Sequence, residues 1–108
     1  MIYHEHIEFH EANGVSIKQI VVHKAGDVVY QHVHDYEHMT LLTNGAVSVI
    51  IDDQMVGRKI APAVIQIEAN KKHEFIALAD NTVLWCIHNS ERQSYTEHPL
   101  TDAVKGVA

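Results

Sequence analysis

The chain has 108 residues, which suits a single domain spanning residues 1–108. Fourteen acidic residues against 8 basic ones give a formal net charge of −6, the wrong sign for a phosphate backbone or an anionic membrane. These values exclude nucleic acid as the expected partner. The single cysteine, Cys86, excludes an intrachain disulfide, and we expect it to be a small buried thiol.

The sequence also lacks the signals of export and of membrane insertion. No stretch approaches the roughly 20 apolar residues that a membrane helix requires. The first residues, Met1 to His6, contain neither the basic region nor the apolar run of a signal peptide. We therefore expect a cytoplasmic protein with no membrane partner.

Short β-branched segments separated by turn residues run through most of the chain. No helical period precedes residue 90, and Asn44-Gly45 is a strong turn signal. Closely spaced strands of this kind predict an all-β sandwich or closed barrel, with its core over residues 15–88. The polar tail, 89–108, is expected to be a loop with one helical turn or a partly ordered extension. In chain order, the expected strands are 15–23, 27–32, 39–43, 46–51, 55–60, 64–68, 73–79 and 82–88.

Histidine is the unusual component, since its 10 residues exceed all the lysines and arginines together. Such density is useful for titration near neutral pH or for metal binding. His32 and His34 are two residues apart, so on a strand their rings share one face. His38 keeps the same parity, whereas Glu37 should point away. Thr40 and Leu42 should continue the inward face behind His38.

A fourth nitrogen donor is expected from later in the chain. His73 is the candidate, because it begins a strand after a polar loop. Ligation by imidazole alone suits Zn, Cu, Fe or Ni and is poor for Mg or Ca, which prefer oxygen. With no carboxylate in the ligand set, the ion would keep its full +2 charge and be a strong Lewis acid.

The spacing of these residues resembles the first motif of the cupin superfamily. The matching segment begins at Gly26, which is followed after five residues by His32-x-His34, after three more by His38 and after a further six by Gly45. His38 stands where cupins usually carry a glutamate ligand. The second motif is weaker. Its histidine corresponds to His73, while Pro62, Glu68 and Asn70 replace the usual glycines and proline.

This resemblance covers residues 15–88 and implies a small antiparallel β-barrel of the cupin or jelly-roll type, often a homodimer. It implies a divalent transition metal inside the barrel (Fe, Ni, Zn, Cu or Mn). The ligands would be His32, His34 and His73, with His38 in the place of the glutamate. An alternative for His38 is a site that has decayed toward a metal-free binding barrel.

Several classes of function fit such a site. The resemblance favours a non-haem dioxygenase acting on a small molecule, with iron as the metal. The alternatives are a non-catalytic barrel that binds or senses a small molecule, and a metal-dependent isomerase or lyase. No residue pattern identifies a general base.

The expected interior, including Phe75, is mostly apolar beyond the histidines and has no evident inward arginine or lysine. Lys71 and Lys72, near the barrel mouth, are expected to be solvated.

The remaining histidines and aromatic residues leave alternatives open. His88 is equally compatible with orienting a ligand inside the barrel and with ending its strand in water. Trp85 is expected in the core or in a dimer interface. No role is assigned to His23 or His98. His4, His6 and His10 share one parity, which is compatible with a second metal site, but a solvated strand face is favoured because terminal segments are rarely rigid enough to hold ligands in place. Tyr30, Gln31 and Tyr36 can hydrogen-bond a substrate or a metal-bound oxygen, and for Tyr30 and Tyr36 ordinary packing in the barrel is favoured.

Overall fold

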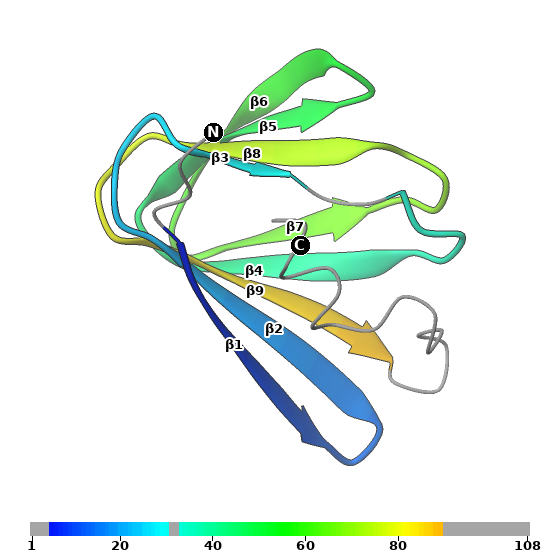
Figure 1. Cartoon of the computed structure of the whole chain (residues 1–108). Coiled ribbons are helices and arrows are strands. Elements are labelled where there is room, and N and C mark those ends of the chain that lie inside the picture. Colours follow the sequence, from blue (N-terminus) through cyan, green and yellow to red (C-terminus); the bar gives the residue numbers. More distant parts are fainter. Residues whose placement is uncertain (1–4, 31–32, 90–108) are drawn as a thin grey trace.

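The computed structural model describes residues 5–30 and 33–89, and this part of the chain is built from nine strands without a helix (Figure 1). No helix long and apolar enough to cross a membrane occurs in these residues. The eight expected strands are confirmed within one or two residues at most ends. An additional strand, β1, comes from the alternating N-terminal segment. The strands are β1 (Glu5–Ala12), β2 (Val15–Val22), β3 (Val28–Tyr30), β4 (His38–Asn44), β5 (Ala46–Ile51), β6 (Gln54–Ile60), β7 (Ala63–Ile67), β8 (His73–Ala77) and β9 (Thr82–Asn89).

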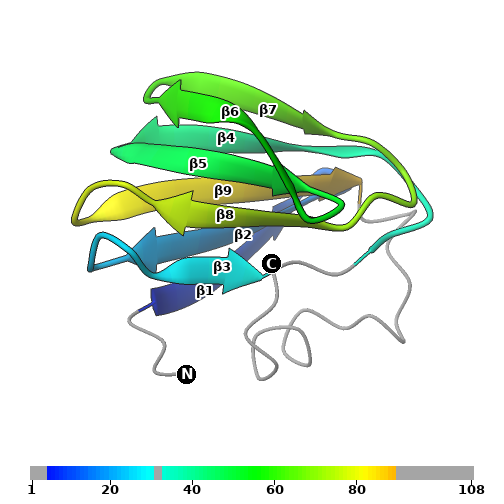
Figure 2. The same ribbon diagram turned by 90° about the horizontal axis from the view of Figure 1, so that it is seen from above.

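The strands form two antiparallel sheets that face each other. The five-stranded sheet has the order β1-β2-β9-β4-β7, and the four-stranded sheet has the order β3-β8-β5-β6. Figure 2, a view from above, shows the four-stranded sheet lying over the five-stranded sheet, with the strands of both sheets running in roughly the same direction. Neighbours such as β2 and β9 are distant in sequence, so each sheet is held together by long-range pairing. Side chains that alternate along each strand therefore fill the space between the sheets.

The inner face of the five-stranded sheet is arranged in rows that run across β2, β9 and β4. The strand pairings place Ile20 beside Leu84 and Leu84 beside Leu42, and all three side chains are fully buried. With Phe75, Val47 and Val49 from the facing sheet, this apolar row forms the core. The next row contains Lys18, Cys86 and Thr40, and the last contains Ser16, His88 and His38. Polarity thus increases toward one end of the space between the sheets.

The turn between β4 and β5 depends on Gly45. Its φ of 86° lies in the left-handed region, as the Asn44-Gly45 pair predicts. A Cβ atom on this residue would lie only 2.9 Å from the Cα of Thr82. The turn therefore packs directly against the start of β9 and helps to hold β4 beside it.

Candidate functional site: a buried histidine cluster

The segment that leads into β4 alternates strictly between buried and exposed side chains. His34 and His38 point inward, and Glu37 is exposed. The predicted parity is therefore confirmed for these three residues. The inward series continues through Thr40 and Leu42, as expected. The buried members of residues 33–40 are His34, Tyr36, His38 and Thr40, and the exposed members are Val33, Asp35, Glu37 and Met39.

Four histidines from different parts of the chain meet at the polar end of the interior. We call His34, His38, His73 and His88 the histidine cluster, and each is no more than 8% exposed. The ring centroids of His38 and His88 are 4.5 Å apart, and those of His38 and His73 are 5.3 Å apart. His34 lies 5.3 Å from His38 and 5.5 Å from His88. The fold therefore brings His73 from β8 to His34 and His38, as the sequence predicted.

One hydrogen bond determines which nitrogen of His73 faces the cluster. The Nδ1–H group donates to the backbone carbonyl of Lys71, with an N···O distance of 3.2 Å. A neutral ring bonded in this way keeps its lone pair on Nε2. That atom is buried and has no hydrogen-bond partner within the described part of the chain. Both ring nitrogens of His38 share this property. Buried nitrogens of this kind are costly unless they have a further ligand.

Burial keeps His38, His73 and His88 uncharged at neutral pH. Loss of hydration lowers the pKa of His38 from 6.5 to about 2, with smaller contributions from His88, His73 and His34. Burial also lowers the pKa of His73 to about 4, although the hydrogen bond to Lys71 acts in the opposite direction. The pKa of His88 falls to about 4, chiefly through burial. Neutral imidazole is the form that binds metal ions.

His88 and Tyr36 belong to this site, although the sequence left their roles open. The Tyr36 hydroxyl lies 3.3 Å from Nδ1 of His88, within hydrogen-bonding distance. The Tyr36 ring also stacks on His34, with centroids 5.1 Å apart. His88 shares the inward parity of Leu84 and Cys86 on β9, which was the signal available in the sequence. Of its two alternatives, the structure selects the interior.

The expectation of an interior without a lysine is wrong. Lys18 on β2 is only 4% exposed and pairs across the sheet with Cys86, which is fully buried as predicted. Lys18 has the same parity as Ile20, so its direction could have been read from the sequence. The expectation that Lys71 and Lys72 are solvated is confirmed. They form exposed ion pairs of 3.5 Å with Asp52 and 2.8 Å with Asp53, respectively.

Some expected site residues lie outside the described part of the chain. His32, the first expected ligand, is among them. The alternatives for His4, His6 and His10 are only partly described, because His10 is the only one of the three whose side chain is placed. It is exposed on β1 and lies 3.6 Å from Glu8. Tyr30 is half-buried on β3, and the Trp85 indole donates a 2.8 Å hydrogen bond to Gln19. The remaining residues with an expected role that lie outside the described part of the chain are Gln31, His4, the side chain of His6, His98 and the tail from residue 90.

The donors of the histidine cluster fit a transition metal in their chemistry. Both ring nitrogens of His38 and Nε2 of His73 belong to neutral rings and have no hydrogen-bond partner among the described residues. Within the described residues, which omit His32, no three His, Cys, Asp or Glu side chains already have the geometry to hold an ion. Metal binding would therefore involve His32 or rotation of the rings.

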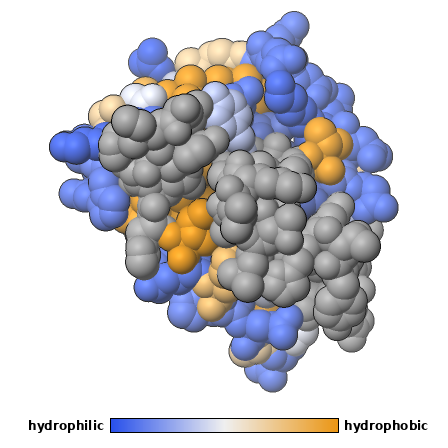
Figure 3. Space-filling model, viewed as in Figure 1, coloured by the Kyte–Doolittle hydropathy of each residue, from blue (hydrophilic) through white to orange (hydrophobic). Residues whose placement is uncertain are grey.

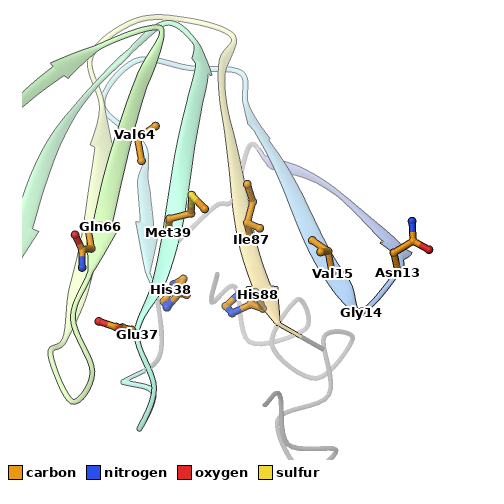
Figure 4. Close-up of a pocket in the computed structure, with 10 residues that line it drawn as sticks. All are labelled: Asn13, Gly14, Val15, Glu37, His38, Met39, Val64, Gln66, Ile87 and His88. Atoms are coloured by element: carbon orange, nitrogen blue, oxygen red, sulfur yellow. The ribbon is translucent and has the colours of Figure 1, made fainter. Parts of the chain in front are cut away.

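A pocket of about 540 Å³ opens beside two members of the cluster. Figure 4 shows the side chains of His38 and His88 pointing toward each other from β4 and β9. Most of the remaining lining residues belong to the outward-facing series of their strands, and they combine apolar side chains such as Met39 and Val64 with the polar Glu37 and Gln66. The remaining lining residues are Asn13, Gly14, Val15, Glu37, Met39, Val64, Gln66 and Ile87.

Known structures with the same fold are numerous, although no protein-family model and no curated protein sequence matches this chain. KdgF from Halomonas sp. is 13% identical with a TM-score of 0.67, and the match covers 78% of this chain and 76% of that one. An RmlC-like cupin from Desulfovibrio desulfuricans is 23% identical with a TM-score of 0.65, covering 79% and 82%.

A third match is the polyketide cyclase RemF from Streptomyces resistomycificus, which is 16% identical with a TM-score of 0.61, covering 77% of this chain and 59% of RemF. Further matches are cupin-2 proteins, including one from Halorhodospira halophila. Identities this low establish only the fold. The fold of these matches agrees with the two antiparallel sheets of this chain. It also agrees with the cupin fold that the spacing from Gly26 to Gly45 predicts. The chain is therefore a small all-β protein with the cupin fold.

Proposed function

We propose that this protein binds a divalent transition metal at the histidine cluster and uses it to bind a small molecule. The observation that carries the proposal is the orientation of His73. Its Nδ1–H is held by the Lys71 carbonyl, so a buried lone pair on Nε2 faces the cluster. Histidine ligands in proteins are usually oriented by such a bond from the second ring nitrogen.

The proposed ligands are His34, His38 and His73, with His32 completing the set. His38 stands where most cupins carry glutamate, so the set contains only nitrogen. Such a set favours Fe, Ni, Zn or Cu and also admits Mn. A bound ion would supply Lewis acidity and, if it is iron, a centre for oxygen chemistry. The fold keeps His34, His38 and His73 buried and close together, and burial keeps His38 and His73 neutral, which prepares them for binding.

A dioxygenase remains the leading proposal for the reaction, because of the resemblance to cupins. One observation favours the isomerase or lyase alternative. The Tyr36 hydroxyl and the His88 ring form a hydrogen-bonded pair inside the cluster, 3.3 Å apart. Such a pair can hold or pass a proton beside a bound carbonyl compound, which non-oxidative chemistry requires. A polyketide cyclase among the matched structures is an example of an enzyme on this fold. A barrel that binds its ligand without turnover is the third possibility.

Metal analysis of purified protein tests the proposal. Protein prepared without chelator should carry close to one equivalent of transition metal, and His34→Ala or His73→Ala should lose most of it. The matched control is His23→Ala, because His23 is exposed and far from the cluster in the fold. Equally low metal in the wild type and in the cluster variants would refute metal binding. Oxygen consumption by iron-loaded protein with diketones, catechols or thiols then separates the dioxygenase from the alternatives.

We also propose that the protein is a homodimer that uses the edge formed by β6 and β7. Ile60, Val56, Val64 and Met55 are the most exposed large apolar side chains described, and Ile60 is 76% exposed. Val56 and Val64 line one cleft of about 280 Å³ between the two edge strands. On the face seen in Figure 3, hydrophilic side chains form most of the outline and apolar ones reach the surface between them.

A second copy is the occupant that the strand edges favour. Each copy carries the same exposed apolar side chains on β6 and β7, so two copies related by a twofold axis would bury them against each other. Exposed edge strands rich in apolar residues are also natural pairing surfaces.

A further inference from the structure

The loop between β7 and β8 contacts two members of the histidine cluster. The backbone N–H group of Asn70 donates a 2.7 Å hydrogen bond to the backbone carbonyl of His34. One residue later, the carbonyl of Lys71 accepts the 3.2 Å hydrogen bond from Nδ1–H of His73. His34 and His73 lie far apart in the sequence, and this short loop holds the backbone of the first and the ring of the second.

Asn70 adopts a backbone conformation that few residues tolerate. Its φ of 62° lies in the left-handed region, which glycine and asparagine enter most readily and β-branched residues almost never. The Asn70 side chain is exposed, so packing in the core does not select it. One of the two hydrogen bonds is formed by the N–H group of Asn70 itself and the other by the carbonyl of the next residue. Both therefore depend on the backbone angles at Asn70.

The far end of the loop is attached to the turn between β5 and β6. The N–H group of Asp52 donates a 2.8 Å hydrogen bond to the carbonyl of Lys72, and the Asp52 carboxylate accepts a 3.0 Å bond from the N–H group of Lys72. The Lys71 ammonium group also lies 3.5 Å from this carboxylate. Because the loop is held at both ends, a change in its backbone would be transmitted to His34 and His73.

We propose that Asn70 is a positioning residue of the metal site, because its left-handed backbone holds the His34 carbonyl and orients the His73 ring through Lys71 at the same time. This inference rests on the proposed function in taking His34 and His73 as ligands. A ring that is already held in place loses less conformational freedom when it binds an ion. A β-branched residue at this position would disfavour the left-handed angle, weaken both hydrogen bonds and release the His73 ring.

Zinc affinity, measured by competition with a chelating dye, tests the proposal. Asn70→Gly should keep the wild-type affinity, because glycine adopts the same angle, whereas Asn70→Val should lower it by about tenfold or more. The matched control is Asn81→Val. Asn81 is also exposed and left-handed, with a φ of 56°, but it precedes β9 at the end of that strand opposite His88. Asn81→Val should lose stability through the same strain and retain its zinc affinity. Equal zinc affinity in Asn70→Val and the wild type, or an equal loss in Asn81→Val, would overturn the proposal.

NMR of the metal-free protein separates this inference from the proposed function. At pH 7 the neutral His73 ring should carry its proton on Nδ1 in the wild type and in Asn70→Gly, and should show a mixture of tautomers in Asn70→Val. If the wild type binds no zinc, this result still supports the positioning role, and one tautomer in all three proteins refutes it. If zinc binds with equal affinity to all three, only the positioning role fails. Asn70→Ala, which is less strained, replaces Asn70→Val in both measurements if the valine variant does not fold.

Discussion

The rings of His38 and His88 stack face to face, with centroids 4.5 Å apart and an angle of 27° between their planes. They come from the neighbouring strands β4 and β9, and both are buried. Protonating both would place two positive charges in contact within a site of low dielectric constant. The pair is therefore stable only when at least one ring is neutral, and this relationship makes the packing of His38 against His88 sensitive to acid.

Stability of the metal-free protein should decrease as the pH falls below about 6.5. The folded-state pKa values of His73 and His88 are lowered from 6.5 to about 4, so between these values the unfolded chain binds more protons. The stability lost between pH 6.5 and pH 4 corresponds to about 3 kcal/mol per histidine. Urea unfolding from pH 7.5 to 4 measures it, with chelator present. His88→Gln should flatten the pH dependence, whereas His23→Gln at the surface should leave it unchanged; identical slopes would contradict the prediction.

Replacing His38 tests its position in the ligand set. His38→Glu should retain metal because it restores the usual cupin ligand, while His38→Ala should reduce the affinity by about tenfold or more. A glutamate at this buried position should also destabilise the metal-free protein, and zinc should restore stability. Metal content and thermal unfolding with and without zinc measure both effects. Equal occupancy in the three proteins would remove His38 from the ligand set.

Tyr36→Phe removes the hydroxyl beside His88 and keeps the ring that stacks on His34. The free energy of unfolding should fall by about 1 kcal/mol, the usual value of a buried hydrogen bond. Tyr36→Ala should cost considerably more, about 3 kcal/mol or above, because it also leaves a cavity. Urea unfolding measures both variants. If Tyr36→Phe retains activity on a substrate once one is found, the hydroxyl takes no part in proton transfer.

Gly45→Ala should be strongly destabilising, and Gly26→Ala provides its control. Both glycines have φ values in the left-handed region, 86° and 95°. A methyl group on Gly45 would collide with Thr82, whereas one on Gly26 would meet open space. Gly26→Ala should therefore cost only the backbone strain of about 1 kcal/mol, and Gly45→Ala should cost about 2 kcal/mol more. Equal losses on urea unfolding would mean that the β4–β5 turn moves away from Thr82.

Charge placed on the β6–β7 edge should dissociate the proposed homodimer. Ile60→Glu and Val56→Glu should each give a monomer by light scattering after size-exclusion chromatography, because a charge buried in an apolar interface is costly. The control is Leu78→Glu, since Leu78 is also exposed, at 42%, but lies outside this edge. A wild-type monomer, or a dimer that survives both substitutions, would exclude this interface.

Much of the architecture was predictable because its signals are local. Alternation and β-branched residues located the strands, and Asn44-Gly45 located a turn, since both depend on neighbouring residues alone. The inward direction of His34 and His38 followed from strand parity for the same reason. The spacing from Gly26 to Gly45 then indicated the cupin fold, which the structural matches support.

Only the tertiary structure decided which residues meet at the cluster. His88 joins His38 because β9 lies beside β4, and Lys18 lies below His88 because β2 pairs with β9 in one register. Strand order and register arise from long-range pairing, which no local pattern specifies. Strand parity also places Lys18 on the inward face, against the usual preference of a lysine on a strand for solvent. The sequence determined which side chains face inward, and the pairing of distant strands determined that four histidines, a tyrosine and a lysine share one interior.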